Sequence, residues 1–202
     1  AQTDNVAVLL RMADVAYMME NYTAMSEVCD KALHLDTSNL QTYLYYAKAC
    51  RGLGEPIRAV AVLSLAIKLR EDYYAARLLR GTILLENHLL DDAAQDADYL
   101  FTHLEPNEDV LLLKARVLKA QEKTKEAEQV YGMVIEVNPF SLDAYRERSE
   151  VRTILGDAAG AAEDEASIKE MGAEVPEPSE GIEQKIKEKM QQMDPYKVFH
   201  NE

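Results

Sequence analysis

The chain repeats itself every 34 residues, and this period constrains its fold more than any other feature. Small residues recur at one position of five successive copies: Ala13, Ala47, Gly81, Ala115 and Ser149. A second column, twelve residues further along, holds Met25, Ala59, Ala93, Ala127 and Ala161. Because no insertion or deletion interrupts the copies, the period predicts an array of like units that bury their apolar faces against one another.

Each copy has the pattern of two helices. In the second copy, apolar residues spaced three and four apart lie on one helix face: Tyr43, Tyr46, Ala47 and Cys50. A second series has the same spacing: Ala59, Leu63, Ala66 and Ile67. Between them, Gly52 is expected to end one helix and Pro56 to begin the next. The small columns mark close crossings of the paired helices, since a large side chain there would push the axes apart.

Residues 6–175 resemble the tetratricopeptide repeat family. The matching segments are Tyr43-x-x-Tyr46-Ala47, Leu111-x-x-x-Ala115, Tyr145-x-x-x-Ser149, Ala59-x-x-x-Leu63, Ala127-x-x-x-Tyr131 and Val137-Asn138-Pro139. The resemblance implies an all-α fold, a right-handed α-solenoid of antiparallel helix pairs. Its five repeats are expected at about 6–39, 40–73, 74–107, 108–141 and 142–175, within one elongated domain of residues 1–175. Four charged residues depart from the family pattern at positions that are usually apolar: Arg77, Arg80, Arg152 and Glu165.

The composition changes after the fifth copy. Pro176 and Pro178 predict a stiff link, and an amphipathic helix follows with its apolar residues on one face: Ile182, Ile186, Met190 and Met193. A solenoid needs a terminal element with a polar outer surface. We therefore expect residues 176–202 to form a link, a capping helix and a tail, with a tethered partner-binding helix as the alternative.

No feature of the sequence predicts catalysis, a metal site or a cofactor. The histidines form no zinc-binding pair, and Cys-x-x-Cys, a glycine-rich phosphate loop and Gly-x-Ser-x-Gly are missing from the sequence. The net charge of −14 argues against nucleic acid as a partner, and no apolar run has the length of a membrane span. We therefore expect a protein that is not an enzyme.

The expected function is a protein–protein interaction scaffold. In tetratricopeptide arrays the first helices of successive repeats line a concave groove, and the resemblance carries this role to ten residues: Leu10, Tyr17, Leu44, Tyr45, Lys48, Leu78, Leu79, Leu112, Leu113 and Arg116. An apolar groove suits a partner protein or peptide with an apolar or amphipathic segment. One leucine or tyrosine of each adjacent pair can instead pack inside its repeat. The alternatives are an assembly subunit of a multiprotein complex, or a groove filled by the chain's own C-terminal tail.

Location and redox state are less constrained. Ala1-Gln2 is what removal of a signal peptide would leave, so we expect an exported protein, periplasmic or secreted, with a cytoplasmic protein as the alternative. Cys29 and Cys50 are expected on inward-facing helix faces, as buried free thiols rather than a disulfide.

Overall fold

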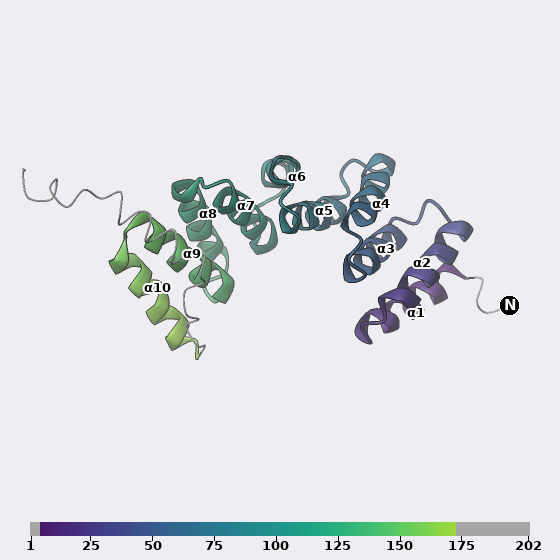
Figure 1. Cartoon of the computed structure of the whole chain (residues 1–202), viewed down its shortest axis with the longest axis horizontal. Helices are drawn as coiled ribbons and strands as arrows, with labels where there is room; N and C mark the ends of the chain where they lie inside the picture. Colours follow the sequence, from purple (N-terminus) through teal and green to yellow (C-terminus); the bar gives the residue numbers. More distant parts are fainter. Residues whose placement is uncertain (1–4, 173–202) are drawn as a thin grey trace, which may run out of the picture. The chain divides into compact units, whose positions relative to one another are not determined.

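The computed structural model describes residues 5–172, which form ten α-helices in five consecutive pairs (Figure 1). The first helices of the pairs are α1 (Val6–Met18), α3 (Leu40–Gly52), α5 (Tyr74–Glu86), α7 (Glu108–Ala120) and α9 (Leu142–Leu155). The second helices are α2 (Tyr22–Leu35), α4 (Pro56–Leu69), α6 (Leu90–His103), α8 (Thr124–Val137) and α10 (Ala158–Glu170). The all-α prediction of paired helices is confirmed. The predicted capping helix and tail, residues 176–202, lie outside the described residues.

Helix starts follow the period because a capping side chain recurs with it. Asn5, Asn39, Asn107 and Ser141 occupy one column, and each accepts a hydrogen bond from a backbone N–H in the first turn of its helix. Such caps satisfy N–H groups that have no partner within the helix. Tyr73 holds the same position before α5 and makes no side-chain cap.

The turn inside each pair also repeats, although its sequence does not. Gly54 and Gly156 adopt φ values of 73° and 84°, in the left-handed region that glycine enters without strain. The same position in the other three copies holds Glu20, His88 and Glu122, with φ of 53°, 60° and 62°. In each copy the next residue's N–H donates to a carbonyl five residues earlier, as Glu55 does to Cys50 at 2.8 Å. This hydrogen bond closes the helix end.

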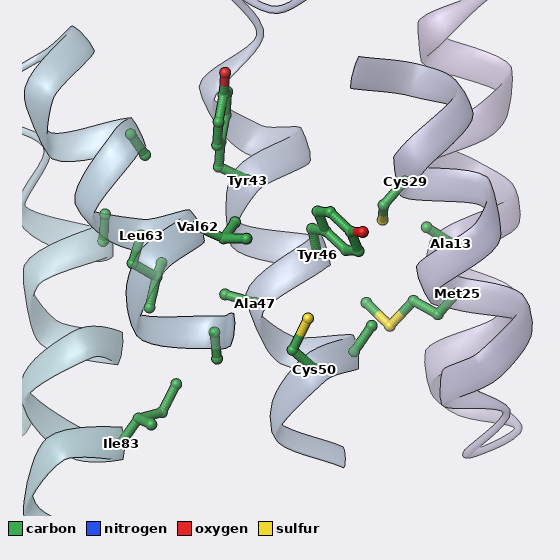
Figure 2. Packing of buried hydrophobic residues seen from close by; sticks show 14 of the residues in the cluster. Ala13, Met25, Cys29, Tyr43, Tyr46, Ala47, Cys50, Val62, Leu63 and Ile83 are labelled. Carbon is green, nitrogen blue, oxygen red and sulfur yellow. The ribbon is translucent and has the colours of Figure 1, made fainter. Parts of the chain in front are cut away.

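The two predicted columns face the interior. Every member of both is buried, and Ala13, Ala47 and Ala115 have no exposed surface. In the fifth pair the Ser149 hydroxyl donates to the Ala161 carbonyl at 3.4 Å, which shows that the columns meet where the two helices cross. Figure 2 shows the same packing around Ala47, where Tyr46 extends from α3 toward Cys29 of α2.

The chain divides into two compact units, residues 1–104 and 105–202. The N-terminal unit contains α1–α6, with an apolar core of residues such as Met25, Leu63 and Ile83. The C-terminal unit contains α7–α10, with Leu111, Tyr131 and Val151 in its core. No helix among residues 5–172 is long and apolar enough to cross a membrane.

Charged residues replace apolar ones in two pairs because each arginine has a buried acceptor. Asp96 is 1% exposed and accepts two hydrogen bonds from Arg80, both 2.7 Å, while Arg77 lies 3.5 Å away. In the fifth pair, Asp164 is equally buried and lies 3.1 Å from the Arg152 guanidinium, and it also accepts two hydrogen bonds from Arg148, at 2.6 and 3.0 Å. A buried charge is tolerated only when it is paired in this way.

Candidate functional site

In the N-terminal unit the first helices lie beside one another, since α3 contacts both α1 and α5. This neighbourhood brings together seven of the predicted groove residues, which we call the first-helix surface: Leu10, Tyr17, Leu44, Tyr45, Lys48, Leu78 and Leu79. None of the seven is buried, and Tyr17 is 43% exposed. Leu44, Tyr45 and Leu79 also pack in part against the core of the unit. The first-helix surface is therefore apolar and aromatic, and it remains open to solvent.

Four polar or aromatic side chains join α1 to α3 in this surface. The Tyr45 hydroxyl donates a hydrogen bond of 2.9 Å to the Asp14 carboxylate. The Lys48 ammonium lies 5.4 Å from the centre of the Tyr17 ring and 5.8 Å from that of Tyr45. Aromatic faces attract cations at this range. Burial raises the pKa of Tyr45, and its hydrogen bond to Asp14 raises it further, so this phenol remains a donor at neutral pH.

Lys48 has no carboxylate partner among the described residues. Two contacts between α1 and α3 join residues 31 positions apart: Asp14 with Tyr45, and Tyr17 with Lys48. The residue 31 positions after Lys48 is Leu79, which cannot accept a hydrogen bond. The Lys48 ammonium therefore lies near two aromatic rings of the first-helix surface and makes no ion pair with a described carboxylate.

In the C-terminal unit, the residues at the corresponding positions are buried or form ion pairs. Leu112 and Leu113 are 7% and 4% exposed, and Leu112 belongs to the core of the unit. Their prediction as groove residues is corrected, because both members of this leucine pair pack inside. Arg116 binds Glu147 at 2.6 and 2.8 Å and Asp143 at 2.8 Å. Its guanidinium is thus occupied by the chain itself.

Other polar groups complete this network on α7, α8 and α9. The Tyr131 hydroxyl donates to Glu147 at 2.6 Å, and Lys119 pairs with Glu150. Burial and the Glu147 charge raise the pKa of Tyr131 far above that of a free phenol. Burial alone would lower the pKa of Arg116, but its bonds to Glu147 and Asp143 outweigh this effect and raise it. The network is a set of satisfied ion pairs.

The described side chains include two cysteines and no metal-binding cluster. No group of three or more histidine, cysteine, aspartate or glutamate side chains in residues 5–172 is arranged to hold a metal ion. Cys29 and Cys50 are free and buried, as the sequence predicted. Burial, with a contribution from Cys50, raises the pKa of the Cys29 thiol to about 12, which disfavours the reactive thiolate.

The fold is that of tetratricopeptide repeat proteins, which confirms the resemblance seen in the sequence. Among solved structures the chain is similar to MamA, residues 41 to the end, from Desulfovibrio magneticus RS-1, with a TM-score of 0.75 and 14% identity over 83% of this chain and 94% of that one. A tetratricopeptide repeat protein from Parabacteroides merdae gives 0.73 and 20% over 93% and 73%. YrrB, described as having an unusual peptide-binding site, gives 0.66 and 15% over 92% and 93%. No family model and no curated protein sequence matches the chain.

The sequence predicted all seven residues of the first-helix surface but not the contacts that join them. Asp14 holds Tyr45, and Glu147 holds Arg116, each across two successive repeats. The signal was present in the sequence as pairs 31 residues apart, three fewer than the period. The period aligns residues 34 positions apart, which hold the same place in successive repeats. The contacts between successive first helices join residues 31 positions apart, which hold different places in their repeats.

Proposed function

We propose that this chain is a non-enzymatic protein-interaction scaffold that binds a partner peptide or helix on the first-helix surface of its N-terminal unit. One observation carries the proposal: Lys48 is held between Tyr17 and Tyr45 without a carboxylate partner, beside part-exposed leucines of α5. The Lys48 ammonium is part-exposed and makes no ion pair with a described carboxylate, so it is available to an anion of a ligand. A ligand that supplies an anion next to apolar side chains would pair with Lys48 and cover the leucines of α5.

The chemistry of the partner follows from these residues. Leu78 and Leu79 offer apolar contact area, and Tyr17 and Tyr45 add rigid aromatic faces. Tyrosines are frequent anchors in protein interfaces because they bury a large area at a small entropic cost. Lys48 adds a preference for a carboxylate. The partner is therefore a peptide or helix with apolar side chains next to an aspartate, a glutamate or a free C-terminus. The solved neighbour YrrB is described as a tetratricopeptide repeat protein with an unusual peptide-binding site.

Two alternatives stay open as predictions. An assembly subunit would use its surfaces within a multiprotein complex, and a self-occupied groove would hold the C-terminal tail, which lies outside the described residues. Removal of residues 176–202 distinguishes the self-occupied groove from the other functions. If the tail fills the groove, its removal should expose the first-helix surface and strengthen partner binding.

Site-specific photo-crosslinking tests the proposal. A photoreactive phenylalanine analogue at Tyr17 or Leu78 should form adducts with a partner when the protein is irradiated in extract, and mass spectrometry identifies the linked peptide. The matched control is Ile57, which is 84% exposed on α4 and lies outside the first-helix surface. The adducts should carry acidic and apolar residues, and the substitution Lys48→Glu should remove them.

The control decides the outcome. Equal yields of the same adduct from Ile57 and Leu78 would show that capture is non-specific, and the first-helix surface would lose its assignment. Adducts that persist unchanged with Lys48→Glu would contradict the role of the cation while leaving the apolar contacts in place.

A further inference from the structure

The outer face of α4, in the middle of the N-terminal unit, is apolar and open to solvent. Ile57, Ala61, Leu65 and Leu69 are spaced four residues apart, which aligns them in one row along the helix. All four are exposed, and Ile57 most of all, at 84%. We call these four residues the α4 row. It is separate from the buried residues of α4, such as Leu63, through which the helix packs against α3 and α5.

The fold does not require an apolar row at this place. The equivalent rows of the other four second helices each contain at least two polar residues, as Thr23, Glu27 and Lys31 of α2 show. Those helices pack against the first helices of their pairs as α4 does. Single apolar residues on a surface are ordinary, whereas a continuous apolar row is typical of a contact surface. The α4 row is therefore a candidate for an interaction that the repeat itself does not supply.

The charges around the row have one sign. Among the five described second helices, α4 is the one without a carboxylate, and each of the others carries at least two. Its two charged residues, Arg58 and Lys68, lie next to the two ends of the row. Arg58 donates to Glu55 at 3.1 Å, whereas Lys68 is exposed and makes no ion pair with a described carboxylate. A chain of net charge −14 thus has an apolar row between two cations.

These charges distinguish between possible occupants. Two copies of α4 packed on each other would bring only cations together, because neither helix has an acid. Residues 182–193 of the chain have an amphipathic pattern, but they contain three lysines and two glutamates. Like charges brought together in an interface oppose binding, and opposite charges favour it. An acidic helix from another protein fits the α4 row better than a second copy or this segment.

We infer that the α4 row binds an acidic amphipathic α-helix of a partner protein. The row is a ridge of side chains four residues apart, about 18 Å long, and such ridges pack into the grooves of another helix. The partner helix carries apolar residues three and four apart, with carboxylates near both ends that meet Arg58 and Lys68. Its largest apolar side chain is expected opposite Ala61, the shortest member of the row. This inference does not depend on the proposed function of the first-helix surface.

Binding of a defined peptide tests the inference. The probe is a stapled helix of about four turns, with leucines three and four residues apart and a glutamate near each end. Fluorescence anisotropy measures its affinity for the full chain at physiological ionic strength. The control peptide has glutamine in place of each glutamate. The acidic peptide should bind about fivefold more tightly, although the protein as a whole is acidic.

Variants of the chain locate the contact. Lys68→Glu replaces attraction by repulsion and should weaken binding of the acidic peptide about tenfold, and Leu65→Ser should weaken it to a similar extent. Both side chains are exposed, so Tm should change by less than about 2 °C. The matched control is Lys31→Glu, the same change of charge at the Leu65 position of α2, which should alter affinity less than about twofold. Equal binding of the two peptides, or equal effects of Lys31→Glu and Lys68→Glu, overturns the inference.

Two further measurements examine the other occupants. Light scattering should show no dimer that Leu65→Ser dissociates; such a dimer would assign the row to a second copy. Removal of residues 176–202 should leave the affinity for the acidic peptide unchanged, and a marked increase would assign the row to the chain's own tail. Either result would overturn the partner helix. Because Ile57 belongs to the α4 row, its photo-adduct should come from a different peptide than that of Leu78.

Discussion

Lys48 in the N-terminal unit and Arg116 in the C-terminal unit occupy the same position of their repeats, two periods apart. Both are cations on a first helix, and both are partly exposed. Lys48 lies between two tyrosine rings without a carboxylate partner in the described chain, whereas Arg116 binds Glu147 and Asp143 at 2.6–2.8 Å. The residue 31 positions later explains the difference, because it is Leu79 in one case and Glu147 in the other. A repeat position fixes where a side chain lies; its partner in the next repeat fixes whether that side chain remains available.

The leucine pairs differ between the units in the same way. Leu78 and Leu79 in α5 keep part of their surface exposed, while Leu112 and Leu113 in α7 are buried. The N-terminal unit thus presents a surface on which apolar area and charge are unsatisfied. The corresponding residues of the C-terminal unit serve its own stability.

The largest effect should come from a feature that the units share, the buried aspartate. Asp164→Ala removes the acceptor of Arg148 and Arg152, whose bonds to it are 2.6–3.1 Å long. Loss of one partner leaves buried charge uncompensated, so the free energy of unfolding should fall by about 3–5 kcal/mol. Asp96→Ala should have a similar cost in the N-terminal unit. Urea denaturation measures both variants.

Hydrogen exchange locates the damage. Protection should fall chiefly in α9 and α10 for Asp164→Ala and in α5 and α6 for Asp96→Ala. Glu163→Ala is the control, because this exposed neighbour should change stability by less than about 0.5 kcal/mol. A cost below about 1 kcal/mol for both aspartates would mean that these ion pairs are replaceable by water.

The second test compares helix crossings, which should be equally tight in both units. Ala47→Leu and Ala115→Leu each insert a large side chain where no surface is exposed. Overpacking should lower the free energy of unfolding by roughly 1–3 kcal/mol in each case. Ala61→Leu on the exposed side of α4 controls for the change of residue and should be almost neutral. If both buried variants have the same melting temperature as the wild type, the assignment of these columns to the helix crossings is wrong.

The smallest effect should distinguish the two cations. Arg116→Met removes charge-assisted bonds to two carboxylates, and since the arginine side chain is 38% exposed, solvent reduces the expected cost to about 1 kcal/mol. Lys48→Met removes only contacts with aromatic rings, worth about 0.5 kcal/mol. Thermal melts at low salt and in 1 M NaCl measure both, and the Arg116 cost should shrink with salt. Equal costs with equal salt dependence would remove the contrast between the units.

Much of the fold was predictable because local rules repeat with the period. Asn5, Asn39 and Asn107 cap their helices in one column, and Pro56 begins α4 where it was expected. The left-handed turns could not be predicted in every copy. Glycine indicates them only at Gly54 and Gly156, while the other three copies have a glutamate or a histidine at positive φ. There the packing of the helix pair imposes the backbone conformation against local preference.

Local patterns predict the helix pairs, their starting points and the small residues at their crossings, because these depend on residue spacing and on caps only a few positions away. The same patterns predict that Lys48, Arg116 and the leucine pairs lie on the first helices. Which of these side chains stay exposed depends on long-range packing. Side-chain exposure depends on whatever lies opposite, and that is set by residues one repeat distant: Leu79 for Lys48, Glu147 for Arg116. Val8 and Val15 of α1 show the same rule: they are exposed, whereas the equivalent positions of α3, α5 and α9 are buried under a second helix that α1 does not have among the described residues.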